Sequence, residues 1–365
     1  LSRKAIAEIQ YILDMQKVRD HLNSFLYTML GISCSIICIA LLLYMMLVKW
    51  MVLNPVEKLS RFTTEIIQSG DFKKQEIVIS TKDEIEDLGN SFNVMLKKLE
   101  TYIENLTAVT AEKERIGTEL NVATHIQSSM LPCIFPAFPD RNELDIYATM
   151  TPAKEVGGDF YDFFMVDQRH IAIVMADVSG KGVPAALFMV IGKTLIKDHT
   201  KPGRDLGEVF TEVNNILCES NDNGMFITAF EGVLDLVTGE FRYVNAGHEK
   251  PFIYRKGKGY EAYKIRPGFV LAGMENIRYK EQMIQLDIGD KVFQYTDGVT
   301  EAMNKDNQLY GMDRLHHILN QQCQTCSPEK TLELVKADID AFAGDNNQFD
   351  DITMLCLEYT KKMEG

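Results

Sequence analysis

The chain has 365 residues and a formal net charge of −14 at pH 7, which argues against general nucleic-acid binding because that function needs a basic face. Its length predicts two or three structural units. The count of seven cysteines is odd and no disulfide framework is expected, while Cys323 and Cys326 form a CxxC pair without the further ligands of a zinc site. The chain begins at Leu1 rather than Met, so further sequence is expected upstream.

The first predicted element is a helix that crosses a membrane. Residues 25–48 contain no charged side chain, and at about 1.5 Å per residue they are long enough to cross roughly 30 Å of hydrocarbon. A signal peptide is the alternative, but residues 1–24 contain Glu8, Asp14 and Asp20 rather than a short basic leader, and they predict a helical stalk outside the cytoplasm. Basic residues flank the span on both sides, so charge orients it only weakly.

Residues 49–100 predict two short amphipathic helices joined by a polar connector. Pro55 opens the first helix and Gly70 ends it. Asp83 can cap the second helix, with Glu86 three positions later as its capping-box partner. This arrangement resembles a HAMP domain, which implies a cytoplasmic position and a parallel dimer that relays signals from a membrane helix. An ordinary helical hairpin is the alternative.

The second of these helices is predicted to continue as a coiled-coil linker over residues 101–131. Apolar side chains occupy the two core heptad positions as far as Met130, and Pro132 ends the helix. Lys113 and Gln127 are polar imperfections in this seam. The heptad seam and the HAMP resemblance lead us to expect a homodimer through the HAMP and linker helices, and the polar core positions predict a weak pairing that can switch. A rotation imposed at the membrane could then reach residue 130, with a passive spacer as the alternative.

Beyond Pro139 the periodicity changes from helical to strand-like. The predicted strands are 144–150, 170–179, 225–236, 240–247, 291–298 and 351–359, and the predicted helices are 183–197, 205–219 and 328–342. Some strands are apolar on both sides, strands bunch together and helices come in pairs. The pattern therefore favours an α+β layered sandwich over a doubly wound parallel fold.

Four aspartates of this region lie at ends of predicted strands: Asp159, Asp177, Asp297 and Asp350. Taken singly, each also has an ordinary structural explanation as a turn residue, a strand start or an acceptor for loop amides. Clustered carboxylates without matched cations would repel one another unless divalent ions lay among them. Oxygen ligands indicate Mg²⁺ or Mn²⁺ rather than zinc.

Five stretches in order resemble the metal-dependent serine/threonine phosphatases of the PPM superfamily, specifically the bacterial SpoIIE-type branch. They are PAKEVGGDFYDFF, ADVSGKGVPAALFM, NAGHEKPFIY, YTDGVTEAMN and FDDITMLCLEY. The resemblance extends over about residues 112–360 and implies a phosphatase domain at 132–362 with an α-β-β-α layered sandwich.

The resemblance also implies a site with two Mn²⁺ or Mg²⁺ ions. The ligands it implies are Asp177 bridging both ions, the Val178 carbonyl, Asp297, Asp350 and, mainly through water, Asp159. Many superfamily members have Asp-Asn where this chain has Asp350-Asp351, and we favour Asp350 as the ligand. Water activated between the ions would attack phosphorus in line, without a covalent phosphoenzyme.

Other polar residues of these motifs have weaker predicted roles. Lys154 is a candidate anchor for the substrate phosphate, with an exposed loop lysine as the alternative. Lys181 and His248 match the family pattern without a ligand role that the sequence supports. Asn245 and Gly247 are predicted to shape a turn beside the site.

The sequence analysis therefore predicts a signal-regulated phosphatase in the bacterial inner membrane, with its catalytic domain in the cytoplasm. By resemblance only, its substrate would be a phosphoserine or phosphothreonine of a small anti-sigma factor antagonist of the STAS type. One alternative is a HAMP-linked diguanylate cyclase, although GGDFYD lacks the acidic residue expected after its aspartate. Another is a non-catalytic signalling scaffold, which the intact acidic positions disfavour.

Overall fold

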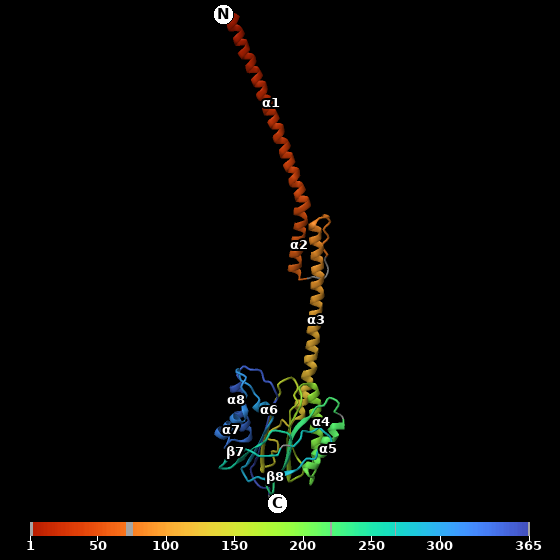
Figure 1. Cartoon of the computed structure of the whole chain (residues 1–365), viewed down its shortest axis with the longest axis vertical. Helices are drawn as coiled ribbons and strands as arrows, with labels where there is room; N and C mark the ends of the chain where they lie inside the picture. Colours follow the sequence, from red (N-terminus) through yellow and green to blue (C-terminus); the bar gives the residue numbers. More distant parts are fainter. Residues whose placement is uncertain (1–2, 71–75, 220, 267, 364–365) are drawn as a thin grey trace. The chain divides into compact units, whose positions relative to one another are not determined.

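The computed structural model describes residues 3–70, 76–219, 221–266 and 268–363 (Figure 1). The chain divides into two compact units, residues 1–114 and 115–365. The first unit is helical, and the second contains the sheets and the predicted site.

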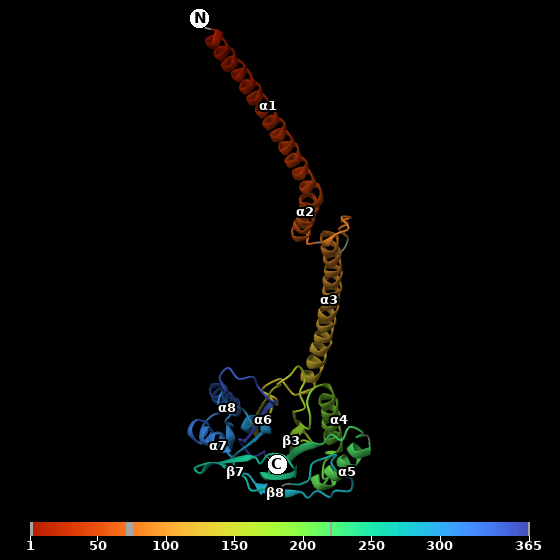
Figure 2. The ribbon, with the colours of Figure 1, turned by 45° about the horizontal axis from the view of Figure 1, so that its top comes forward.

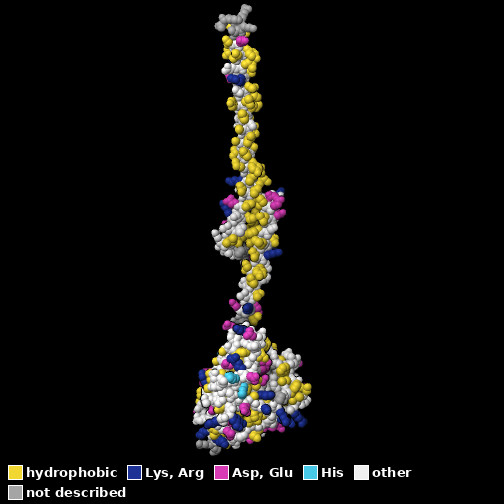
Figure 3. Space-filling model, turned by 60° about the vertical axis from the view of Figure 1, so that its left-hand side comes forward, with side chains coloured by type: hydrophobic (Ala, Val, Ile, Leu, Met, Phe, Trp, Pro, Cys, Tyr) yellow, Lys and Arg dark blue, Asp and Glu magenta, His cyan; other side chains and the backbone are white. Residues whose placement is uncertain are grey.

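The first unit begins with the long helix α1 (Arg3–Val48), which contains the predicted span 25–48. Among the described residues, one helical stretch is long and apolar enough to cross a membrane, judged by length and composition alone. Apolar side chains are exposed along it, as the yellow atoms in Figure 3 show. Such a surface agrees with the predicted span, because large exposed apolar areas are rare on proteins that face only water.

The two predicted HAMP helices are present with the predicted ends. A short π-helical segment, η1 (Lys49–Leu53), leads into α2 (Asn54–Ser69). Helix α2 ends at Gly70, whose N–H donates to the Ile66 carbonyl (2.9 Å). At the start of α3 (Glu84–Met130), Asp83 Oδ1 accepts from the Ile85 N–H (3.0 Å). Glu86 reaches back to the N–H of Lys82 (2.8 Å), one residue before the expected capping-box partner.

A small core holds these helices together. The connector that precedes α3 is fixed by Asn93, whose amide accepts from the Ile77 N–H (3.0 Å) and donates to the Ile77 carbonyl (2.9 Å). Phe62 of α2 and Phe92 of α3 meet edge to face at 6.2 Å between ring centroids. The buried apolar side chains of this core are Ile66, Ile77, Ile79 and Leu96.

The second unit contains two antiparallel five-stranded sheets in its described residues, with strand orders β1-β10-β9-β6-β7 and β2-β3-β4-β5-β8. The strands are β1 (Leu144–Thr151), β2 (Phe160–Met165), β3 (His170–Val178), β4 (Ile227–Asp235), β5 (Glu240–Ala246), β6 (Phe252–Arg255), β7 (Gly259–Ala262), β8 (Gln282–Gln285), β9 (Lys291–Tyr295) and β10 (Ile352–Tyr359). The helices are α4 (Val183–His199), α5 (Leu206–Glu219), α6 (Asp297–Thr300), α7 (Gly311–Gln322) and α8 (Pro328–Ala343).

Helices cover both outer faces of the paired sheets. Helices α4 and α5 pack on the sheet that contains β2, β3 and β5, and helices α7 and α8 pack on the sheet that contains β1, β7 and β10. Figures 1 and 2 show the green and blue helix pairs on opposite flanks of the strands. The predicted α-β-β-α layered sandwich is confirmed.

All six predicted strands and all three predicted helices of this unit are present, but the sequence analysis missed several elements. The missed elements are β2, β6, β7, β8, α6 and α7. Three of the missed strands have four residues each, too few to show a period. The predicted strand 291–298 ends at Tyr295, because Asp297 and Gly298 begin helix α6.

Buried carboxylates of the sheet under α4 have polar partners at that helix. Asp162 of β2 accepts from Lys193 Nζ (2.6 Å) and Lys197 Nζ (3.2 Å) of α4. In the same row of the sheet, Glu231 of β4 is fully buried and accepts from the Thr200 hydroxyl (2.7 Å). Burial raises the pKa of Glu231 to about 8, the Thr200 hydrogen bond opposes this, and the nearby Asp162 charge adds to it.

Replacing Glu231 by Gln is expected to remove a pH-dependent loss of stability. The folded protein keeps a proton on this carboxyl up to about pH 8, whereas an unfolded glutamate loses it near its ordinary pKa of 4.5. The free energy of unfolding of the wild type therefore falls as pH rises through this window. We expect its melting temperature to fall more between pH 6 and 9 than that of Glu231→Gln. Glu261→Gln, an exposed change on β7, is the control, and equal pH slopes for all three proteins would contradict the prediction.

Candidate active site

The strand registers bring the predicted aspartates together as two pairs. Phe160 of β2 is opposite Ala176 of β3, which places the adjoining Asp159 and Asp177 side by side in one sheet. In the other sheet Met354 of β10 is opposite Tyr295 of β9. The residues before β10, Asp350 and Asp351, therefore lie beside Asp297 at the start of α6.

Two threonine hydroxyls join the pairs across the sheets. Thr296 and Thr353 each donate to Asp159 Oδ2 at 2.6 Å. Asp159 is buried, so these hydrogen bonds replace the water that its carboxylate would otherwise need. Sequence analysis missed both threonines, although each stands within three residues of a predicted aspartate, in YTDG and DDIT.

Burial and nearby carboxylates raise the pKa of three aspartates at this edge. Burial, followed by the charges of Asp177 and Asp351, raises the pKa of Asp159 well above its ordinary value. Burial likewise raises the pKa of Asp177 to about 6, a hydrogen bond with Asp159 opposes this, and the charges of Asp350 and Asp351 add to it. Burial and the charges of Asp177 and Asp350 raise the pKa of Asp297 to about 7. All five carboxyl groups therefore belong to one electrostatic cluster, called here the acidic cluster.

Asp350 and Asp351 have different surroundings, although they are neighbours in the chain. Asp351 is buried and accepts from the backbone N–H groups of Ala153 (2.8 Å) and Gly158 (2.8 Å), so it holds the Gly-Gly loop in place. The side chain of Asp350 is 27% exposed and pairs with Lys181 Nζ at 2.8 Å. Asp350 is therefore the more accessible of the two carboxylates, and Asp351 has a structural task in the loop.

The two glycines before Asp159 are needed for close approach. A Cβ on Gly157 would lie 2.3 Å from Asp351 Oδ2, and a Cβ on Gly158 would lie 2.8 Å from the Val178 carbonyl oxygen. Any larger residue would push the loop away from both partners.

The end of helix α3 also holds this loop. Gln127 is buried, donates from Nε2 to the Gly157 carbonyl (2.6 Å) and accepts at Oε1 from the Gly157 N–H (3.1 Å). Thr124, one turn earlier, donates to the Glu155 carbonyl. The predicted polar break of the heptad seam at Gln127 thus has a partner within the second unit, because its amide binds Gly157. The polar residue at a core heptad position was the signal for this contact.

The donor set fits hard divalent cations by its chemistry. It consists of clustered carboxylates and a backbone carbonyl, and the mutual repulsion of the carboxylates is the condition that bound cations relieve. Across residues 3–70, 76–219, 221–266 and 268–363, no three His, Cys, Asp or Glu side chains are arranged to hold one ion as they stand. Asp159 is engaged by two hydroxyls and Asp350 by a lysine.

The residues with weaker predicted roles differ in their exposure and hydrogen bonding. Lys154 is exposed in the loop before the two glycines. The Asn245 amide bonds the backbone N–H (3.1 Å) and carbonyl (2.9 Å) of His248, and Gly247 has a φ of 75°, so the predicted turn is confirmed. His248 is buried beside the Thr228 hydroxyl (2.9 Å), and burial lowers its pKa to about 3, which keeps the ring neutral.

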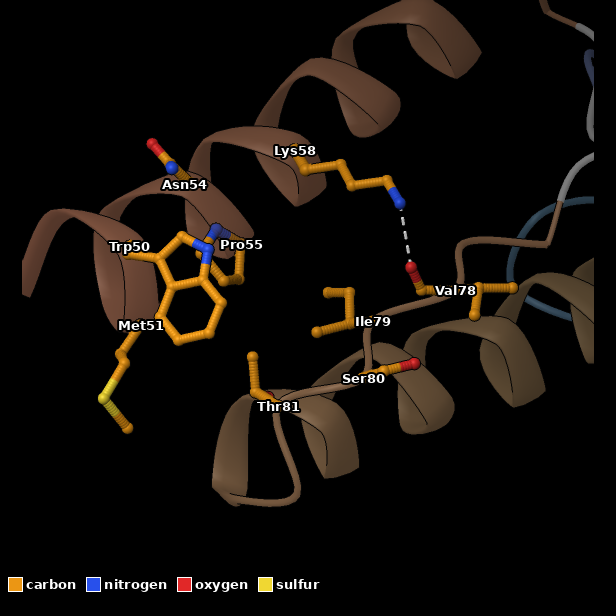
Figure 4. A pocket seen from close by; sticks show the side chains of 9 residues that line it. All are labelled: Trp50, Met51, Asn54, Pro55, Lys58, Val78, Ile79, Ser80 and Thr81. Carbon is orange, nitrogen blue, oxygen red and sulfur yellow. Dashed lines mark hydrogen bonds between the residues drawn. The ribbon is translucent and has the colours of Figure 1, made fainter. Parts of the chain in front are cut away.

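A separate hollow lies in the first unit (Figure 4). Lys58 Nζ crosses it to donate to the Val78 carbonyl (2.9 Å). The residues that line it are Trp50, Met51, Asn54, Pro55, Lys58, Val78, Ile79, Ser80 and Thr81. The residues that line it include no Asp, Glu, His or Cys. It therefore offers none of the acidic chemistry found in the second unit.

Comparisons with known proteins agree with both units. Residues 167–360 match the family described as Stage II sporulation protein E (SpoIIE), and residues 47–101 match the HAMP domain. The chain is 31% identical to Protein IcfG of Synechocystis sp., over 84% of this chain and 52% of that protein, so it spans about half the length of this relative. It is 30% identical to the phosphoserine phosphatase RsbU of Bacillus subtilis, over 76% of this chain and 80% of RsbU.

Solved structures share the fold of the second unit. The SiaA-PP2C domain of Pseudomonas aeruginosa aligns with a TM-score of 0.60 at 20% identity, over 68% of this chain and 99% of that domain. The PP2C phosphatase domain and regulatory fragment of SpoIIE from Bacillus subtilis align with a TM-score of 0.52 at 17% identity, over 59% of this chain and 63% of that one. The chain therefore belongs to the SpoIIE family of PP2C-type serine/threonine phosphatases and carries a HAMP domain.

Proposed function

We propose that this protein is a membrane-anchored, signal-regulated phosphatase that hydrolyses phosphoserine or phosphothreonine in a protein substrate. The observation that carries the proposal is the meeting of two aspartate pairs, one from each sheet, through the hydroxyls that bind Asp159. Family membership and the printed name of RsbU, a phosphoserine phosphatase, support it. A diguanylate cyclase finds no support, because the acids at TDG and DDIT lie in the same cluster as the GGD aspartate.

The proposed ligands of two Mn²⁺ or Mg²⁺ ions are Asp177, the Val178 carbonyl, Asp297, Asp350 and, through water, Asp159. When bound, such cations supply the Lewis acidity for in-line attack of water on phosphorus and offset the charge of the transferring phosphoryl group. Thr296 and Thr353 fix Oδ2 of Asp159, so the direction of this carboxylate is set before a cation binds. Lys154 stays a candidate for the substrate phosphate, because its ammonium is exposed in the adjoining loop.

The substrate class remains a proposal from the family resemblance. A small anti-sigma factor antagonist of the STAS type, phosphorylated on serine or threonine, is the partner that we propose. Divalent cations held by the acidic cluster would attract the phosphate of such a substrate, and Asp350 is partly open to solvent, where a protein surface could present it.

Membrane anchoring and dimer formation are proposed from the first unit and the linker. Helix α1 would cross the inner membrane, and the HAMP domain would place the catalytic domain in the cytoplasm. Apolar side chains at core heptad positions of α3 are exposed in the single chain, and a parallel second copy would bury them. Their exposed fractions are 40% for Leu99, 50% for Leu106, 66% for Val109 and 45% for Ile116.

Regulation is proposed to act through the contact between the linker helix and the Gly-Gly loop. The Gln127 amide binds both the backbone N–H and the carbonyl of Gly157, two residues before Asp159. A shift or rotation of α3 would therefore move the loop that carries this aspartate. A signal that repacks the paired linker helices would in this way change the acidic cluster.

Replacing Gln127 by Leu is expected to lower kcat by about tenfold and to raise the Mn²⁺ concentration needed for half-maximal activity, because the loop loses both amide contacts. Asn121→Leu is the matched control, since it makes the same kind of change at an exposed position of the same helix. Phosphate release at a series of Mn²⁺ concentrations measures both effects. Equal Mn²⁺ dependence in the two variants would show that Gln127 does not position the loop.

The proposed function is tested with the full chain in detergent micelles or liposomes. We expect release of phosphate from a phosphoserine protein in the presence of Mn²⁺, and loss of release on addition of EDTA. The same preparation is expected to leave GTP unchanged. No release from any phosphoserine or phosphothreonine protein, with Mn²⁺ present and the chain folded, would favour the non-catalytic scaffold.

A further inference from the structure

Lys181 lies at the acidic cluster, in the loop between β3 and α4. Its Nζ is 2.8 Å from Asp350 Oδ2 and donates to the Phe349 carbonyl (2.6 Å). The same ammonium lies 4.1 Å from the centre of the Phe349 ring, a distance at which the ring face attracts a cation. Lys181 is therefore held by contacts on the segment that carries Asp350.

The contacts of Asp350 show what the lysine does there. Asp350 Oδ1 already accepts from the Asp351 N–H (2.9 Å), so the backbone fixes the direction of this carboxylate without help from a side chain. Lys181 takes the other oxygen, Oδ2. That oxygen is the one from which a cation could be bound without breaking the backbone contact.

We propose that Lys181 is the internal counter-ion of the acidic cluster and competes with the divalent cation for Asp350 Oδ2. The inference rests on the proposed function, because it assumes that the cluster binds divalent cations. A cation held by Asp350 would lie within a few ångströms of the ammonium, and like charges at such distances repel strongly. Binding is therefore an exchange in which the ammonium leaves Oδ2 and keeps its contacts with Phe349.

This exchange makes the affinity for the cation lower than the carboxylates alone would give. A variant without the ammonium presents the same oxygens with no competitor, so it should bind Mn²⁺ more tightly. An orienting lysine would have the opposite effect, because its loss would let the Asp350 side chain turn away. The sign of the change in affinity therefore separates the two roles.

The test is isothermal titration of Mn²⁺ into the full chain in detergent micelles, without substrate. We expect Lys181→Gln to lower the Kd for Mn²⁺ by about tenfold, as removal of one nearby positive charge predicts. Lys181→Met, which keeps an apolar stem over the Phe349 ring, is a second neutral variant with the same expected result. Lys181→Arg should stay near the wild type.

Lys258→Gln, which removes the same charge at an exposed position in the β6–β7 turn, is the control and should leave the Kd unchanged. Mn²⁺ binding that is unchanged or weaker in both neutral variants would overturn the inference and leave the proposed function standing. A wild-type chain that binds no Mn²⁺ would overturn both.

Discussion

Replacing Asp177 by Asn is expected to lower phosphate release from a phosphoserine protein by at least about a thousandfold. Asp177 is the aspartate whose pKa reflects the charges of both Asp350 and Asp351 and whose neighbour across the strands is Asp159. It therefore interacts both with the aspartate of its own sheet and with those of the other sheet, as a bridging ligand would need to do. The measurement is kcat/KM at saturating Mn²⁺.

The same change has an expected effect on stability that separates function from folding. Asn removes one of several mutually repelling charges, so the cation-free Asp177→Asn protein should melt at the same temperature as the wild type or higher. Asp287→Asn, an exposed change between β8 and β9, is the control for both measurements. Turnover that stays at the wild-type level in Asp177→Asn would remove the proposed mechanism.

The sequence predicts those site residues that a local pattern marks, namely the aspartates at the ends of strands. Asp159, Asp177, Asp297 and Asp350 each stand where a strand begins or ends, and strand ends are visible as changes from apolar runs to Gly, Asp and Asn. The layered fold follows from the same runs. Neither inference needs to know which strands pair.

The missed residues depend on pairings between distant parts of the chain. Thr296 and Thr353 bind an aspartate that is 137 and 194 positions away, respectively. Nothing in the local pattern distinguishes these threonines from others, because their task is fixed by the register across two sheets. Gln127 and Gly157 are 30 positions apart, and their contact depends on how helix α3 ends against the domain. Only the polar break in the heptad pattern marked Gln127 in advance.

Lys181 shows a different limit of sequence reasoning. The SGKG motif was visible, but a lysine between glycines has no fixed direction until the loop is built. Its role as a counter-ion depends on Asp350, which arrives from the far end of the chain. The same pairing gives the two adjacent aspartates different surroundings, which the sequence alone does not distinguish.

Replacing Asp350 is expected to lower mainly the activity, whereas replacing Asp351 is expected to lower the stability of the fold as well. Asp350 is partly exposed and its carboxylate meets Lys181, so Asp350→Asn should lose about a hundredfold in kcat/KM with little change in melting temperature. Asp351 is buried and accepts from two loop N–H groups, so Asp351→Asn sets an amide NH₂ against a backbone donor. We expect that variant to lose about 2 kcal/mol of unfolding free energy.

Activity should also fall in Asp351→Asn, because the loop that carries Asp159 is no longer held at the backbone of Gly158. Thermal unfolding and phosphate release on the two variants measure the balance, with Asp287→Asn again as the control. An inactive but fully stable Asp351→Asn, together with an active Asp350→Asn, would exchange the two roles. That outcome would also remove the basis for Lys181 as a competitor, since the lysine would then face a carboxylate that binds no cation.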